Sequence, residues 1–191
     1  MNSDPTLASP SRWRRIARVL ERMFAIVGVL LVTYHVFFNF SVISSGSMSP
    51  TLQGTGMNNG DTVLTEKLSL RLRPPRRWEV VLYEDSEFGA QVMKRVVALP
   101  GETISLRDTK TVLINGQPIS RPASLESLKY YAYGNLQNGS SFACRDDYYL
   151  LGDDSKDSQD SRYIGALPRS AFHGRAWLRV WPPSRMGFVN P

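Results

Sequence analysis

One apolar stretch dominates the hydrophobic pattern of the chain. Residues 23–43 read MFAIVGVLLVTYHVFFNFSVI, with no formally charged side chain when His35 is neutral. A helix rises about 1.5 Å per residue, so this run is long enough to span a hydrocarbon core of about 30 Å. Arginines cluster just before it, at positions 12, 14, 15, 18 and 22. This pattern predicts a basic cytoplasmic tail at residues 1–22, a transmembrane anchor at 23–43 and export of residues 44–191.

A cleavable secretory signal is the alternative interpretation of the same stretch. A basic segment precedes it, and small residues at 44–46 offer a cleavage point. However, the apolar run exceeds the usual core of about 7–15 residues in such signals. Cleavage after Gly46 would also detach Ser47 from the membrane. We therefore favour a retained anchor, in which His35 contacts an interface or a neighbouring backbone.

Beyond the anchor, apolar residues come in short β-branched runs separated by turn signals, which is typical of an all-β domain. Asn115-Gly116 is a strong signal for a two-residue hairpin turn. Residues 64–73 give mixed signals, and the polar, tyrosine-rich segment 121–145 indicates either an excursion from the sheet or a cap over it. The predicted strands are 62–66, 79–83, 91–99, 103–106, 111–114, 118–119, 148–151 and 175–180.

Composition narrows the functional classes. The chain has 191 residues, a formal net charge of +6 and 42% hydrophobic residues, which is sufficient for a folded domain. The cluster of arginines just before the apolar run favours a membrane over a nucleic acid, and no aromatic–basic interleaving indicates nucleic-acid binding. A single cysteine, Cys144, excludes an intramolecular disulfide, and His35 and His173 lie far apart with no Cys/His cluster. We expect no metal and no organic cofactor.

Ser47, a few residues beyond the apolar run, is the candidate nucleophile. A serine needs a base to remove its proton. The neighbours of His173 include no carboxylate that could orient it, which leaves a Ser-His-Asp triad unsupported. Lysine is the other known partner, but its pKa of about 10.4 must fall through desolvation before it acts as a base near neutrality.

Lys94 is the candidate base. If 91–99 is a strand, Lys94 shares one face with Val92 and Val96, and Arg95 faces outward. This alternation alone leaves two interpretations open: a buried base, or an exposed lysine that protects a sheet edge from aggregation.

The segment 152–165 alternates acidic residues with serines. It does not fit a calcium-binding EF-hand loop, because Ser158 stands at the glycine position and Ile164 at the glutamate position. The segment is either a solvated acidic loop or a support for a neighbouring site through Ser158, Asp160 and Arg162.

Three separated segments, in order, resemble the bacterial-type signal peptidase I (leader peptidase) family. They are Ser45-Gly46-Ser47-Met48-Ser49-Pro50-Thr51-Leu52, residues 94–102 (KRVVALPGE) and residues 152–165; Gly60-Asp61-Thr62-Val63-Leu64 matches a weaker box. The resemblance extends over most of residues 41–181. It implies a mainly β fold, with a signal-peptidase-type antiparallel sheet domain after one transmembrane helix. It also implies a single-pass protein of the plasma (inner) membrane.

The resemblance further implies roles for individual residues. Ser47 would be the nucleophile and Lys94 the general base, with the Ser47 N–H and the Ser45 hydroxyl forming the oxyanion hole. Apolar pockets that involve Ile43 and Met48 would accept small side chains one and three positions before the cut in a preprotein signal peptide. Ser158 would orient Lys94, while the remaining supporting residues, Asp153, Asp160 and Arg162, would hold the loop.

Some positions depart from the family pattern. Ser44 stands where proline is frequent, Trp78-Glu79 where Gly-Asp is frequent, and Val92-Met93 where an aromatic residue is frequent. These departures concern the substrate pocket and loop packing. Two other functions remain as alternatives: a specialised Ser-Lys peptidase that matures a restricted set of substrates, and a non-catalytic, membrane-anchored β-domain that binds a partner.

Overall fold

The computed structural model describes residues 12–54, 56, 59–85 and 89–189. The chain divides into two units, residues 1–37 and 38–191. The first unit contains one helix, α1 (Arg12–Phe37). Residues 1–11 of the expected tail lie outside the described part, whereas Arg12–Arg22 are helical. This start is consistent with the run of good helix formers there, which no glycine or proline interrupts before Gly28.

The expected anchor of residues 23–43 is wrong at its C-terminal end. Helix α1 ends at Phe37, and Phe38–Val42 form strand β1 instead. Phe38, Phe40 and Val42 alternate with Asn39 and Ser41, which is the period of a strand. Among the described residues, no helix combines the length and the apolar run that a membrane crossing requires.

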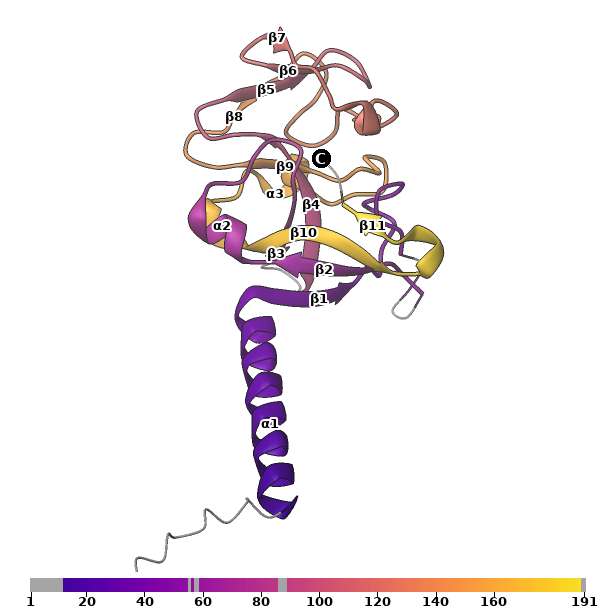
Figure 1. Cartoon of the computed structure of the whole chain (residues 1–191). Helices are drawn as coiled ribbons and strands as arrows, with labels where there is room; N and C mark the ends of the chain where they lie inside the picture. The colour runs from indigo at the N-terminus through magenta and orange to yellow at the C-terminus, as the bar shows by residue number, and fades with distance from the viewer. Residues whose placement is uncertain (1–11, 55, 57–58, 86–88, 190–191) are drawn as a thin grey trace, which may run out of the picture. The chain divides into compact units, whose positions relative to one another are not determined.

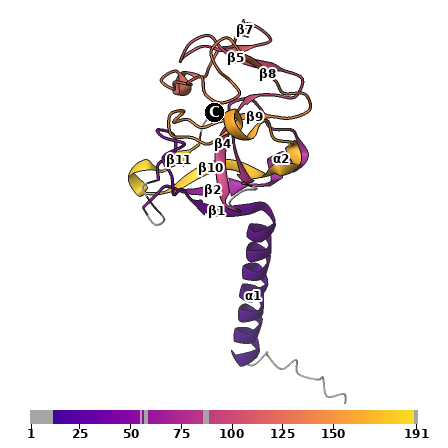
Figure 2. The same ribbon diagram turned by 180° about the vertical axis from the view of Figure 1, so that it is seen from behind.

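The second unit contains two antiparallel sheets (Figures 1 and 2). The first has the strand order β1-β2-β10-β3-β4-β9, with β11 beside β10. Its strands are β1, β2 (Thr62–Glu66), β3 (Val80–Glu84), β4 (Gln91–Ala98), β9 (Tyr149–Leu151), β10 (Phe172–Trp181) and β11 (Gly187–Phe188).

The second sheet has the order β7-β6-β5-β8. Asn115 and Gly116 both have positive φ, as the predicted hairpin turn requires, and join β6 to β7. Part of the weakly patterned segment 121–145 supplies the edge strand β8. The strands are β5 (Thr103–Leu106), β6 (Val112–Ile114), β7 (Gln117–Pro118) and β8 (Ser141–Ala143).

Two short helices complete the second unit: α2 (Leu68–Leu72), in the stretch with mixed signals, and α3 (Ser161–Ile164). Single 3₁₀ turns occupy 123–125, 169–171 and 183–185. The apolar core has separate parts. One lies under the second sheet, where Leu125, Tyr130 and Leu136 are buried, and another surrounds Met48, Leu52 and Met93. The polar segment 121–145 therefore contributes to the core.

Candidate active site

Ser47 and Lys94 meet in the second unit. Beyond β1 the chain turns through residues 44–52, here called the serine loop, in which the Ser49 amide donates to the Gly46 carbonyl at 2.8 Å. Lys94 Nζ donates to Ser47 Oγ at 2.7 Å. Ser47 is 9% exposed and Lys94 only 2%. The two side chains, 47 positions apart in sequence, therefore form a buried pair.

Burial changes the proton affinity of Lys94. Desolvation lowers its pKa to about 8, although the carboxylates of Asp160 and Asp153 oppose that change. Val92 and Val96, on the same face of β4, pack in the apolar cluster around Tyr83. The edge-strand interpretation of Lys94 is excluded, because this lysine is enclosed. At pH 7 about a tenth of Lys94 is therefore a neutral amine, far more than for an exposed lysine, and this form can accept a proton.

The expectation that Arg95 faces outward is wrong. Arg95 is fully buried, and its Nη2 lies 2.6 Å from Asp153 Oδ2. Its Nη1 donates to the Trp78 carbonyl at 2.6 Å and its Nη2 to Thr51 Oγ1 at 3.2 Å. Both faces of this part of β4 are covered, which the alternating pattern did not indicate. Arg95 thus connects β4 to the serine loop and to the acidic loop (residues 152–165).

Asp160 organises the acidic loop. Its Oδ2 accepts from the Ser158 hydroxyl at 2.8 Å and from the Gly152 amide at 2.9 Å. Its Oδ1 pairs with Arg162 Nε at 2.8 Å, and both side chains are fully buried. Arg162 also donates to Ser155 Oγ at 2.7 Å. This loop is therefore a buried hydrogen-bonded network, and its Ser158 hydroxyl is directed to Asp160.

The acidic loop contacts the serine loop directly. The Asp154 amide donates to the Ser47 carbonyl at 3.0 Å. At Gly152 an added Cβ would lie 2.6 Å from that carbonyl oxygen and 2.1 Å from Ser158 Oγ. Only glycine allows this approach, because a real Cβ would overlap both atoms. The close packing fixes the backbone of Ser47 relative to β9 and the acidic loop.

Ser45 lies beside Ser47 on the same loop. Their hydroxyl oxygens are 3.2 Å apart, within hydrogen-bond distance. Ser45 is exposed, so its hydroxyl is accessible to an incoming group. Either of the two hydroxyls can be the donor in this contact.

Two arginines that sequence analysis did not single out hold the far side of the serine loop. Arg179, on β10, donates to the Thr51 carbonyl at 2.7 Å, and Arg185 donates to the Pro50 carbonyl at 3.2 Å. Arg185 also pairs with Asp61 at 3.3 Å, and Asp61 in turn accepts from the Gln53 amide at 2.8 Å. No sequence signal distinguishes these arginines in a basic chain, because their partners lie far away in sequence.

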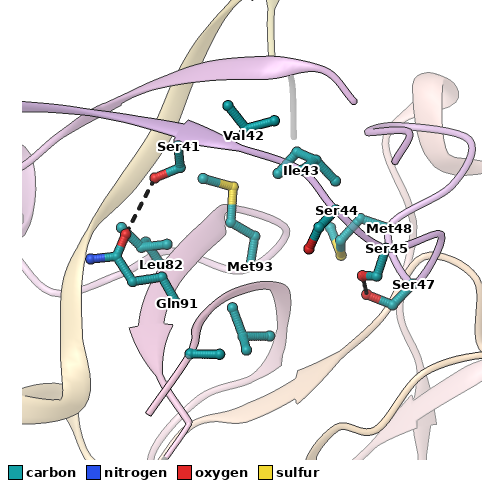
Figure 3. Close-up of a pocket in the computed structure, with 12 residues that line it drawn as sticks. Ser41, Val42, Ile43, Ser44, Ser45, Ser47, Met48, Leu82, Gln91 and Met93 are labelled. Carbon is teal, nitrogen blue, oxygen red and sulfur yellow. Dashed lines mark hydrogen bonds between the residues drawn. The ribbon is translucent and has the colours of Figure 1, made fainter. Parts of the chain in front are cut away.

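A cavity of about 130 Å³ opens beside Ser47 (Figure 3). Ile43 and Met48 line it, as does Met93 from β4. All three side chains belong to one buried apolar cluster. Ser41 and Gln91 line the end of the cavity away from Ser47 (Figure 3).

His173 and a metal ion were the other candidates for activating a serine. His173 is exposed on β10, and the amine beside Ser47 belongs to Lys94. Within the described ranges, no group of three or more histidine, cysteine, aspartate or glutamate side chains could hold a metal ion.

Comparisons with known proteins identify the family. The family model described as signal peptidase, peptidase S26, matches residues 16–181. A signal peptidase I of Leptolyngbya laminosa is 35% identical over 157 residues, which covers 78% of this chain and 71% of that protein. A probable signal peptidase I-1 of a Synechocystis strain is 31% identical over 188 residues, or 93% of this chain and 89% of that protein.

A crystal structure of a signal peptidase I from Enterococcus faecalis V583 is 28% identical. It covers 54% of this chain and 97% of its own chain, with a TM-score of 0.44. The family match extends over most of the chain and contains the serine loop, Lys94 and the acidic loop. This chain therefore belongs to the signal peptidase family, peptidase S26, and is a serine endopeptidase.

Proposed function

We propose that this protein removes signal peptides from exported preproteins, with Ser47 as nucleophile and Lys94 as general base. The main support for this proposal is the 2.7 Å hydrogen bond between the buried side chains Lys94 Nζ and Ser47 Oγ. A lysine whose pKa is about 8 is partly neutral at physiological pH. When neutral, Lys94 Nζ can accept the hydroxyl proton of Ser47 across this hydrogen bond and thereby activate the serine.

The reaction then follows the acyl-enzyme route. Ser47 Oγ attacks the scissile carbonyl while Lys94 takes its proton, and the leaving amine receives that proton as the peptide bond breaks. Water, activated by the neutral Lys94, hydrolyses the resulting ester. The Ser47 N–H and the Ser45 hydroxyl stabilise the tetrahedral oxyanion, and such a donor is typically worth about 3 kcal/mol.

The substrate lies in the cavity of Figure 3 as an extended strand. β1 pairs with β2 along one edge, and β4 pairs with β9 only from Arg95 onward. Among the described residues, β1 is thus an edge strand, and its outer edge and the Gln91–Met93 edge of β4 border the cavity. Strand addition to such edges is a common way to bind peptides. The small apolar space between Ile43, Met48 and Met93 favours alanine-sized side chains beside the cut.

Membrane association follows from two apolar surfaces, each described within its own unit. In α1, the apolar side chains from Met23 to Val36 are exposed, after the cluster of arginines. In the second unit, Phe40 and Phe188 share one cross-strand row, and Val42 and Trp181 share another. All four are at least half exposed. Such apolar surfaces favour a lipid interface, so we infer that the protein is held at a membrane, with the catalytic unit on the exported side.

The direct test is incubation with a synthetic preprotein. The wild-type protein should release the signal peptide, whereas Ser47→Ala and Lys94→Met should each remove processing and keep the circular dichroism spectrum of the wild type. Processing that survives Lys94→Met would contradict the Ser-Lys dyad. Incubation with several different preproteins distinguishes general processing from a restricted substrate set. If a serine-directed acylating probe failed to label Ser47, the result would support a non-catalytic binding domain.

A further inference from the structure

The cavity beside Ser47 has two chemically different ends (Figure 3). The end near Ser47 combines the apolar side chains of Ile43, Met48 and Met93 with serine hydroxyls that include that of Ser47 itself. At the far end, Leu82 lies beside a hydroxyl from Ser41 and the amide of the exposed Gln91. A pocket that selected only aliphatic side chains would have no need of hydrogen-bonding groups at either end.

Strand alternation explains why Ser41 faces the cavity. Val42 is 51% exposed, and its neighbours Ser41 and Ile43 share the other face of the chain. Ser41 Oγ donates to Gln91 Oε1 at 3.5 Å, and Asn39 Nδ2 donates to the same oxygen at 3.4 Å. Both distances exceed the usual hydrogen-bond lengths, so these contacts are weak and a ligand hydroxyl can replace either partner at little cost.

An extended peptide can place two side chains in one cavity of this kind. In an extended chain, residues two positions apart share one face and lie roughly 7 Å from each other. The substrate side chain just before the cut occupies the apolar end, next to Ser47. The side chain three positions before the cut then reaches the end formed by Ser41 and Gln91.

We propose that Ser41 and Gln91 select a small hydrogen-bonding side chain, such as threonine, over its aliphatic isostere three positions before the cut. This inference rests on the proposed function and names a specificity determinant of the same site. The substrate hydroxyl donates to Gln91 Oε1 and accepts from Ser41 Oγ. A valine of the same shape would separate these two groups and satisfy neither.

Two peptides that differ only by threonine or valine at that position test the proposal with the full chain in detergent. The wild-type protein should cleave the threonine peptide with a kcat/KM about three- to tenfold higher, the range expected for one hydrogen bond. Gln91→Leu should remove this preference or reverse it. Gln91→Glu keeps an acceptor and should retain it, and Gln117→Leu, an exposed change on β7, should leave it unaltered.

Equal cleavage of the two peptides by the wild-type protein would overturn the inference, as would an unchanged ratio in Gln91→Leu. Neither result would affect the Ser47–Lys94 assignment, because both require cleavage. Failure of the wild-type protein to cleave either peptide would overturn the proposed function, and this inference with it.

Discussion

Arg95 forms a fully buried ion pair with Asp153. Arg95 directly follows Lys94, the lysine that contacts Ser47. Removing only one partner leaves an uncompensated charge in the core. We expect Arg95→Met to lower the free energy of unfolding by about 3–5 kcal/mol. Urea denaturation of the full chain measures this loss.

The double variant Arg95→Met/Asp153→Leu provides the control. It removes both charges, so it should recover much of the lost stability. Preprotein processing should be impaired in both variants, because the hydrogen bond from Arg95 to Thr51 is gone. A double variant that is no more stable than Arg95→Met would show that the destabilisation does not come from the unpaired carboxylate.

Asp160 raises the pKa of Lys94, against the dominant desolvation. Neutralising it in Asp160→Asn should therefore shift the acid limb of the pH–rate profile to lower pH. Asp157 acts in the same direction with the smallest effect, and it is exposed. Asp157→Asn should give a smaller shift with unchanged stability. A shift of either profile to higher pH would contradict this electrostatic account.

Arg179 holds the Thr51 carbonyl from outside the serine loop. Without it the loop should sample more conformations, so Arg179→Ala should lower kcat about tenfold, as expected when reacting groups are misplaced. Arg107 is an exposed arginine of the same unit and provides the matched control. The Arg107→Ala variant should keep the wild-type kcat. A normal kcat in Arg179→Ala would remove this arginine from loop positioning.

Burial of Lys94 makes its amine reactive, and it should also lower the free energy of unfolding of the protein. Its pKa falls from 10.5 to about 8 on folding, so the unfolded chain binds more protons between these values. The cost is fully present below pH 8 and is relieved as pH rises toward 10.5. Allowing for the lost hydrogen bond to Ser47, Lys94→Met should be about 2 kcal/mol more stable than the wild type at pH 6.

Denaturant unfolding at pH 6, 8 and 10 measures that difference, which should shrink between the last two values. A variant that is less stable than the wild type at pH 6 would show that burial of the charged lysine costs little.

Local signals in the sequence were sufficient for several elements. Asn115-Gly116 has the positive φ angles that its hairpin turn demands, and the predicted strands 62–66 and 103–106 match β2 and β5 in full. These features depend on turn chemistry and on a two-residue period, both of which act over a few residues. The three segments that resemble signal peptidase I also include both members of the Ser47–Lys94 pair.

Long-range packing was beyond sequence analysis. Residues 38–42 looked like the end of an apolar helix, because their pairing partners in β2 lie 20–28 positions away in sequence. Arg95 was placed on an outer face because alternation assumes one solvated side, whereas β4 is covered on both. Arg179 and Arg185 contact carbonyl groups more than 120 residues away in sequence, and a single sequence carries no record of such contacts.

The central claim is that a neutral lysine amine, made available by burial, takes the proton of one serine. The rate at which Ser47 is acylated by a serine-directed probe, followed from pH 5 to 10, tests it most directly. The account predicts a tenfold rise per pH unit that levels off near pH 8, the value to which burial lowers the pKa of Lys94, and almost no acylation in Lys94→Met at any pH. A pH-independent rate, or a Lys94→Met protein labelled as fast as the wild type, would contradict it.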